Sequence, residues 1–301
     1  MSIAYLPSPS RDVWHLGVIP VRAWALCTVL GIVVAIWLTR WRYRAAGGQP
    51  RVITDVAAWA VPLGIAGARL YSVLTDYQLY FGRHADWVTL ARVWDGALGL
   101  PGALVLGFAG VVIACRRAAV PLAPVLGAAA PAAAVGQAIG CWGDWFSQQL
   151  YGRPSSLPWA LEIAPAHRLN GYETFATFQP VFLYQCLCGL LTAAVVIWAA
   201  RRFRLTGDRA FAVYVAAFSV GMFLTQTVRA DYSHHLLGLR TDEWAALVGL
   251  AGAAWYLHRT RHADPLAHLR SAPRPAGTPG KSSSSNAIAR AGGDDRGRTM
   301  A

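Results

Sequence analysis

Long apolar segments, separated by shorter polar stretches, run through most of the chain. Each is close to the ~20 residues that a helix needs to cross the hydrocarbon core of a bilayer. The segments cover about residues 19–39, 53–74, 96–114, 122–141, 180–200, 210–228 and 241–257. The pattern therefore predicts an all-α polytopic membrane protein with seven transmembrane helices.

Arginine residues are unevenly distributed between the polar stretches. They follow the first, third, fifth and seventh apolar segments, as Arg40, Arg42, Arg44, Arg51, Arg116, Arg117, Arg201, Arg202, Arg204, Arg209, Arg259 and Arg261. Because basic loops stay in the cytoplasm, we expect the N-terminus outside and the C-terminus in the cytoplasm. The two long outside loops, at about 75–95 and 142–179, are then expected to form a small extracytoplasmic head.

The composition is typical of a membrane domain and argues against nucleic-acid binding. Hydrophobic residues make up 55% of the chain and charged residues 14%, against about 25% charged in soluble domains. The net charge of +12 comes largely from arginines that follow apolar segments, which is a topology signal. From residue 263 the chain is rich in Pro, Gly, Ser and Arg. We predict a membrane domain over 1–262 and a disordered cytoplasmic tail over 263–301.

The cysteine and histidine residues form no metal-site pattern. The five cysteines lie mostly inside apolar segments, without a CxxC pair or zinc spacing, and are expected to be small core residues. The neighbours His234 and His235 have no further ligand at a convincing spacing. We therefore expect no metal and no cofactor.

The stretch 140–154 is the most unusual part of the sequence. It reads Gly-Cys-Trp-Gly-Asp-Trp-Phe-Ser-Gln-Gln-Leu-Tyr-Gly-Arg-Pro and directly follows an apolar segment. Plain spanning helices do not end in such a dense run of glycine, aromatic, amide, acidic and arginine groups. Glycine lets a backbone approach a head group closely, and the arginine fork suits phosphate. The stretch therefore indicates chemistry at a membrane–water boundary.

Further motifs in the same order extend this pattern along the chain. They are Pro7-Ser8-Pro9 with Trp14-His15-Leu16-Gly17, Gly67-Ala68-Arg69-Leu70-Tyr71, Trp94-Asp95-Gly96, Thr177-Phe178-Gln179-Pro180, Leu183-Tyr184-Gln185, Gly221-Met222-Phe223 and Val228-Arg229-Ala230-Asp231. With the stretch 140–154, they resemble the prolipoprotein diacylglyceryl transferase family over about residues 7–257.

The resemblance implies a reaction at the outer leaflet of the bacterial plasma membrane. A diacylglyceryl group moves from phosphatidylglycerol to the thiol of a lipobox cysteine in a prolipoprotein, and glycerol phosphate is released. The implied partners are phosphatidylglycerol, prolipoprotein signal peptides and membrane lipid. Such chemistry needs cationic or amide groups for the phosphate, help in deprotonating the thiol and a lateral entrance for lipid.

The family's functional positions identify candidate site residues by resemblance. The catalytic candidates are Asp95, Asp144 and Arg153, and the substrate-binding candidates are Arg69, Tyr71, Gln149, Gly152 and Arg229. Structural interpretations stay open: Arg153 or Gly152 can serve a turn, Arg69 can reach the membrane surface, and Asp95 or Asp144 can cap a helix.

Several positions depart from the family's pattern. The signature Arg, two Asn and Glu, the acid after Leu-Tyr, and the Arg and Glu of the sixth segment are here Cys141, Asp144, Ser147, Gln149, Gln185, Met222 and Gln226. The first-segment Tyr is Trp24, and the His before Gly-Gly is Asp95. Arginines and acids disappear together, which is physically coherent because an unpaired charge in a membrane cavity is costly.

The loss of these charges leaves two functions open. The phosphate clamp would rest on Arg153, Arg69 and Arg229, and losing one such donor lowers a rate by a factor of about 100 to 1000. The first function is a phosphatidylglycerol–prolipoprotein diacylglyceryl transferase. The alternative is a catalytically degenerate paralogue that binds phospholipid or prolipoprotein without turnover.

Overall fold

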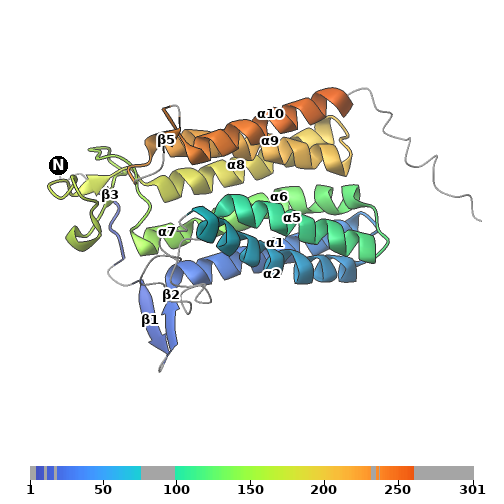
Figure 1. Ribbon diagram of the computed structural model, residues 1–301, viewed down its shortest axis with the longest axis horizontal. Helices are drawn as coiled ribbons and strands as arrows, with labels where there is room; N and C mark the ends of the chain where they lie inside the picture. Colours follow the sequence, from blue (N-terminus) through green and yellow to red (C-terminus); the bar gives the residue numbers. More distant parts are fainter. Residues whose placement is uncertain are drawn as a thin grey trace, which may run out of the picture. The chain divides into compact units, whose positions relative to one another are not determined.

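Helices dominate the computed structural model, which describes residues 5–9, 12–16, 19–75, 99–231, 235–236 and 238–260 (Figure 1). The long helices of this described part are α1 (Ala23–Ala45), α2 (Pro50–Thr75), α5 (Leu100–Arg117), α6 (Leu122–Gly140), α8 (Val181–Arg202), α9 (Gly207–Val228) and α10 (Thr241–Thr260). A short helix, α7 (Trp142–Ser147), follows α6, and a 3-10 turn, η1 (Pro165–His167), precedes α8.

Five helical stretches of this described part are long and apolar enough to cross a membrane. They are α1, α2, α6 continued through α7, α8 and α9. Helices α5 and α10 coincide with the third and seventh apolar segments, and the seven-span arrangement stays a prediction. Residues 76–95 of the first expected outside loop and the expected tail 263–301 lie outside the described residues.

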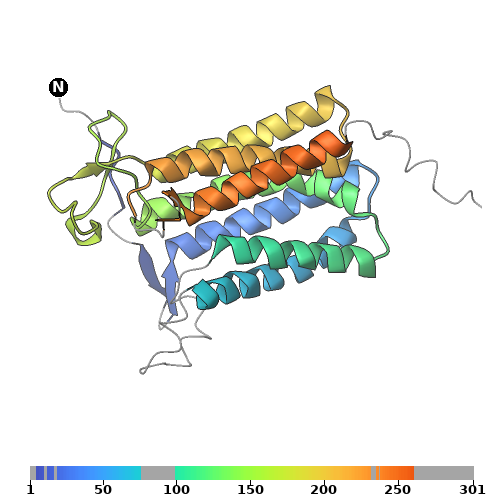
Figure 2. The same ribbon diagram turned by 45° about the horizontal axis from the view of Figure 1, so that its top comes forward.

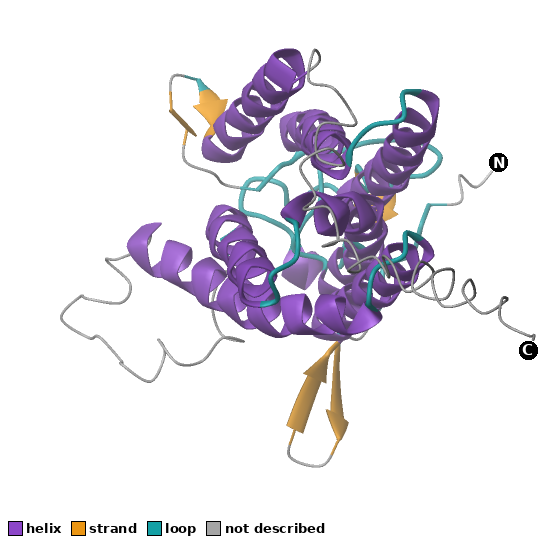
Figure 3. Ribbon diagram, turned by 90° about the vertical axis from the view of Figure 1, so that its right-hand side faces the viewer, coloured by secondary structure: helices purple, strands orange, loops and turns teal. Residues whose placement is uncertain are grey.

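Three short antiparallel strand pairs accompany the helices in the described part of the chain. They pair β1 (Val13–Leu16) with β2 (Ile19–Arg22), β3 (Leu161–Glu162) with β4 (Thr177–Phe178), and β5 (His235–Leu236) with β6 (Leu239–Arg240). The first hairpin projects from the helices (Figure 3). Its second strand occupies residues 19–22, which the apolar pattern predicted as the start of the first helix. Pro20 and the β-branched Ile19 and Val21 favour an extended chain there, so the helix begins at Ala23.

Large apolar side chains point outward and small ones fill the interior. Trp37 of α1 is 65% exposed and Leu191 of α8 is 64% exposed, whereas Ala130, Ala132 and Ala134 of α6 are fully buried. Helix α6 packs against α1, α8 and α9, and α10 lies along α9 (Figure 2). This inverted distribution is that of helices surrounded by lipid, where small residues allow close helix contacts.

Paired glycines mark the places where helices approach most closely. A Cβ placed on Gly67 of α2 would overlap the backbone carbonyl of Gly102 in α5, and a Cβ on Gly102 would overlap that of Gly67. Gly31 of α1 and Gly136 of α6 stand in the same relation. These two crossings leave no room for any side chain, so glycine is required by packing.

Substituting Gly67 with Ala is expected to destabilise the protein by about 1–3 kcal/mol, because the α2–α5 pair would have to separate. Gly64 is the matched control on the same helix: a Cβ there lies no closer than 3.6 Å to a neighbour. Gly64→Ala should be neutral or stabilise by up to about 1 kcal/mol through helix propensity. Thermal unfolding in detergent measures both variants, and equal midpoints would contradict the close crossing.

Residues 148–180 connect α7 to α8 and carry a small core of their own. Tyr151, Leu161, Ile163 and Phe178 pack together there with Phe182 of α8. The N-terminal segment 5–9 is attached to it, because the Leu6 N–H donates to Ala160 O at 2.9 Å and the Glu162 N–H donates to Leu6 O at 3.0 Å. The predicted second outside loop is therefore an ordered unit at one end of the helices (Figure 1).

Candidate functional site

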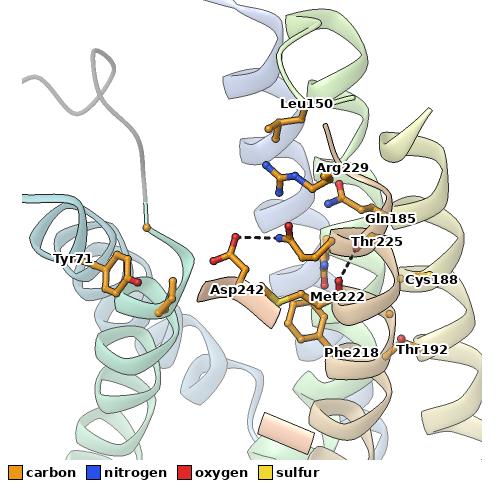
Figure 4. Close-up of a pocket in the computed structure, with 16 residues that line it drawn as sticks. Tyr71, Leu150, Gln185, Cys188, Thr192, Phe218, Met222, Thr225, Arg229 and Asp242 are labelled. Atoms are coloured by element: carbon orange, nitrogen blue, oxygen red, sulfur yellow. Dashed lines mark hydrogen bonds between the residues drawn. The ribbon is translucent and has the colours of Figure 1, made fainter. Parts of the chain in front are cut away.

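A cavity of about 490 Å³ lies between the helices, and we call it the inner cavity. Tyr71 of α2 lies on one side of it, opposite Gln185 of α8 and Met222 of α9 (Figure 4). Gln137 of α6 and Thr192 of α8 also line it. Amide and hydroxyl groups therefore face a space formed largely by apolar helices.

Gln226 and Asp242 meet in the inner cavity. Gln226 is 4% exposed, and its Nε2 donates a hydrogen bond to Asp242 Oδ2 at 3.1 Å (Figure 4). The Gln226 Oε1 is buried and has no hydrogen-bond partner within the described residues. Asp242 and Gln226 thus form a hydrogen-bonded polar pair among the residues that line the cavity.

Arg229 follows the end of α9 and is held by a carboxylate two residues later. Its Nε and Nη2 donate to the two oxygens of Asp231 at 2.7 and 2.8 Å. Asp231 also accepts a hydrogen bond from Arg240 Nη2 at 2.9 Å, and the Arg240 N–H donates to Glu243 Oε2 at 2.9 Å. Two arginines therefore share one carboxylate in charge-assisted bonds.

A second cavity of about 720 Å³ adjoins the first, and we call it the arginine cavity. Arg153, Arg229 and Arg240 line it, and Gln226 and Arg229 belong to the walls of both cavities. Arg153 is exposed, and its guanidinium makes no hydrogen bond or ion pair within the described part of the chain. A cation that has no internal partner is available for an anionic ligand.

Backbone hydrogen bonds fix Arg153 beside the end of α9. The Arg153 N–H donates to Val228 O at 3.1 Å, and the Gly152 N–H donates to Gln179 O at 2.9 Å. A Cβ on Gly152 would lie 2.8 Å from the Gln179 Cβ and 2.9 Å from Val228 O. The structure thus explains Gly152 by close backbone packing, which is the structural interpretation left open for it.

The side chains of Gln148 and Tyr151 stabilise the segment 148–180, which carries Arg153. Gln148 has a left-handed backbone with φ of 52°, and its amide donates to Pro9 O at 2.8 Å and accepts from the Ala164 N–H at 3.0 Å. The Tyr151 hydroxyl donates to His167 O at 3.0 Å and accepts from the Leu169 N–H at 2.6 Å. Burial raises the pKa of Tyr151 above its usual range, so the phenol stays protonated as this geometry requires.

Asp144 lies in a third cavity, of about 340 Å³, between α1 and the α6–α7 junction. Cys141 and Gln137 line the same space. Neither Asp144 nor Cys141 lines the inner cavity or the arginine cavity. The structure therefore does not bring the catalytic candidates Asp144 and Arg153 into one cavity.

The other site candidates also lie in different places, some in a cavity wall and some outside the cavities. Tyr71 and Arg229 line the inner cavity, whereas Arg69 is buried and Gln149 is exposed, and neither lines any of the three cavities. Asp95 lies outside the described residues. Gln185, Met222 and Gln226, which the resemblance alone identifies as departures from the family's pattern, all line the inner cavity.

Several cavity residues were not singled out from the sequence. They are Gln137, Thr192, Arg240, Asp242 and Glu243. Gln137 is the polar residue within an Ala-rich segment, and polar groups inside membrane helices are a general sign of function. The Asp and Glu of Thr241-Asp242-Glu243 are hidden among ordinary helix N-terminal residues, so their pattern carried no signal.

The fold and the cavities define a helical membrane protein with a polar, arginine-bearing site among its helices. Comparison of sequences identifies the family. The sequence profile of the family described as prolipoprotein diacylglyceryl transferase matches residues 11–259. The chain belongs to this family, which confirms the resemblance.

Relatives from Streptomyces and Corynebacterium are similar over most of their length. Phosphatidylglycerol–prolipoprotein diacylglyceryl transferase 2 of Streptomyces coelicolor is 48% identical over 265 residues, covering 88% of this chain and 84% of the relative. Transferase 1 of the same organism is 47% identical over 259 residues, covering 85% and 74%. The Corynebacterium glutamicum enzyme of the same name is 43% identical over 263 residues, covering 84% and 83%.

Proposed function

We propose that this protein transfers a diacylglyceryl group from phosphatidylglycerol to the cysteine thiol of a prolipoprotein signal peptide. The observation that carries the proposal is the pair of adjoining cavities, with Arg229 in the walls of both and the unpartnered Arg153 in one. The names of the similar proteins support the same reaction. No nucleic acid, metal or cofactor enters the proposal.

The proposed reaction forms a bond between the cysteine sulfur and the terminal glycerol carbon of the diacylglyceryl group. The bond between that carbon and the phosphate oxygen breaks, and glycerol phosphate leaves with the electron pair. Arg229 and Arg153 bind the phosphate, where donors act most strongly because charge develops there. Asp95 is proposed from the resemblance as the base that takes the thiol proton, with Asp144, Arg69 and Gln149 as supporting candidates.

A degenerate, non-catalytic form is the second candidate, and one observation favours it. Gln185, Met222 and Gln226 all line the inner cavity, and these are positions where the family pattern has an acid, an arginine and a glutamate. A cavity without these charges can still bind a lipid, but it offers less stabilisation to a transition state.

A transfer assay tests the proposal and separates the two functions. The purified protein is placed in phosphatidylglycerol vesicles with a lipobox peptide, and glycerol phosphate release is followed beside the Streptomyces coelicolor transferase 2. We expect release that falls by about 100-fold or more in Arg153→Ala. Arg116→Ala, an exposed arginine at the end of α5, removes the same charge and should release glycerol phosphate like the wild type. Binding without release would support the degenerate form.

The membrane arrangement completes the proposal. We propose that α5 and α10 span the bilayer together with the five apolar stretches, placing residues 142–179 outside and the C-terminus in the cytoplasm of a bacterial cell. The arginines that end α1, α5 and α8 support this orientation. A fluorescent protein that matures only in the cytoplasm, fused after residue 262, should fluoresce; a dark but expressed fusion would refute the orientation.

A further inference from the structure

A further cavity, of about 580 Å³, lies along α1, and we call it the α1 groove. It is lined by side chains of α1 and by the first residue of α2, and these include Val33, Trp37, Arg40, Trp41, Arg44 and Pro50. The α1 positions recur every three or four residues, so their side chains share one face of the helix. None of these residues lines the inner cavity, the arginine cavity or the cavity of Asp144.

The α1 groove is apolar in one part and cationic in the other. Val33 and Trp37 are exposed apolar side chains, and the exposed Arg40 and Arg44 follow them toward the end of the helix. At 1.5 Å per residue, Val33 and Arg40 are separated by about 10 Å along the helix axis. Because α1 is long and apolar enough to cross a membrane, this face can place acyl chains beside Val33 and head groups beside the arginines.

The two arginines of the α1 groove are not occupied by the protein itself. The guanidinium groups of Arg40 and Arg44 make no hydrogen bond, ion pair or ring contact within the described part of the chain. At the end of α5, by contrast, Arg117 lies over the ring of Trp59 at 5.1 Å. The described residues that line the α1 groove include no acid. The groove therefore carries two positive charges that none of its lining residues balances.

We propose that the α1 groove binds an anionic phospholipid of the cytoplasmic leaflet, with its phosphate at Arg40 and Arg44 and an acyl chain along Val33 and Trp37. The inference rests on the proposed membrane arrangement, which places the end of α1 in the cytoplasm. That arrangement places Arg153 on the outer side of the membrane. The lipid in the α1 groove is therefore a bound lipid separate from the substrate, and it is not consumed.

The charge and the shape of the α1 groove together select the class of lipid. An anionic lipid brings net negative charge to two arginines, which attract it in the same way as a basic segment beside a membrane. A zwitterionic lipid brings its own ammonium beside these arginines, where the described lining has no acid to balance it. A water-soluble phosphate would pair with the arginines but would leave the apolar part of the groove without a ligand. We therefore expect a preference for anionic phospholipid over both.

Native mass spectrometry of the full-length protein, titrated with phosphatidylglycerol or phosphatidylcholine of matched acyl chains, tests this preference. We expect the wild type to bind two molecules of phosphatidylglycerol, one at the transfer site and one in the α1 groove. Arg40→Ala combined with Arg44→Ala should weaken the binding of one of them by about tenfold or more. Phosphatidylcholine should show no such difference between the two proteins. An equal concentration of glycerol phosphate should not displace the lipid of the groove.

Arg116→Ala combined with Arg202→Ala is the matched control, because these exposed arginines end α5 and α8 and line none of the four cavities. It removes the same charge and should bind both lipids like the wild type. Unchanged phosphatidylglycerol binding in the Arg40 and Arg44 double variant would overturn the proposal. So would an equal loss of phosphatidylcholine, or displacement of the lipid by glycerol phosphate. If the double variant does not fold, Arg44→Ala alone decides, with an expected loss of about threefold to fivefold.

Failure of the transfer reaction gives a different result from failure of the α1 groove. If the protein is not a transferase, the wild type releases no glycerol phosphate, but the double variant at Arg40 and Arg44 still loses one lipid. If the α1 groove binds no lipid, the double variant keeps the wild-type lipid binding, whatever the release assay shows.

Discussion

Replacing Arg229 with Ala is expected to reduce glycerol phosphate release by a factor of about 100 to 1000. Arg229 is the cation common to both cavities, and its fork is already oriented by two bonds to Asp231. An arginine fixed in this way can present its remaining N–H groups to a phosphate with little loss of conformational freedom. If the protein binds lipid without turnover, the same substitution should weaken phosphatidylglycerol binding to vesicle-reconstituted protein at least about tenfold.

Two companion variants separate ligand contact from structural damage. Arg229→Lys keeps the charge but cannot form the two-pronged bond, so an intermediate loss is expected. Arg229→Ala combined with Asp231→Asn removes the Arg229–Asp231 ion pair, while the Asn side-chain oxygen can still accept from Arg240, which shares Asp231 with Arg229 in the wild type. If the double variant recovers wild-type release, the loss in Arg229→Ala came from the altered Asp231–Arg240 pair, and the assignment of phosphate to Arg229 is wrong.

Introducing the two charges that the resemblance implies for positions 222 and 226 is expected to raise turnover by about 100-fold over the wild type. The substitutions are Met222→Arg and Gln226→Glu, which lie one turn apart on α9 and line the inner cavity together. At this spacing the two new side chains can pair with each other. The new arginine adds a second cation beside the reacting phosphate, and the glutamate balances it.

Each single substitution should give slower release of glycerol phosphate and a lower unfolding temperature than the pair. Gln226→Glu alone places a second carboxylate at a site where Gln226 now donates to Asp242, and two like charges in a membrane cavity repel strongly. Met222→Arg alone can still pair with Asp242 and should be tolerated better. Single-turnover release of glycerol phosphate and thermal unfolding measure the four proteins of this cycle. A folded double variant without faster release would show that the missing charges do not limit the reaction.

The sequence predicted the helices more reliably than the contents of the cavities. The apolar segments coincide with the long helices because a helix in lipid must be apolar around most of its surface. The sequence could not predict that Gln137 and Asp242 line the same cavity, because they lie in helices that are far apart in the chain. Each of them, taken alone, looks like an isolated polar residue.

The stretch 140–154 shows where linear proximity misleads. Asp144 and Arg153 are close in sequence, and both were assigned catalytic roles from the resemblance. The chain turns between them at Gln148, which has a left-handed backbone. Asp144 therefore lines the cavity beside α1, whereas the Arg153 N–H bonds to Val228 at the end of α9. Such a turn depends on the contacts of Gln148 with Pro9 and Ala164, which no local pattern reveals.

The attachment of segment 5–9 also fixes an order of assembly. Leu6 bonds to Ala160 and Glu162, and the Ser8 hydroxyl bonds to the Glu162 carbonyl, 154 residues further along the chain. At about 5–20 residues per second, the ribosome needs on the order of ten seconds to make that intervening chain. Segment 5–9 can thus dock only after residues that are made much later. Residues 148–180 hold Arg153. The site is therefore complete only after the helices between segment 5–9 and residues 148–180 have been inserted.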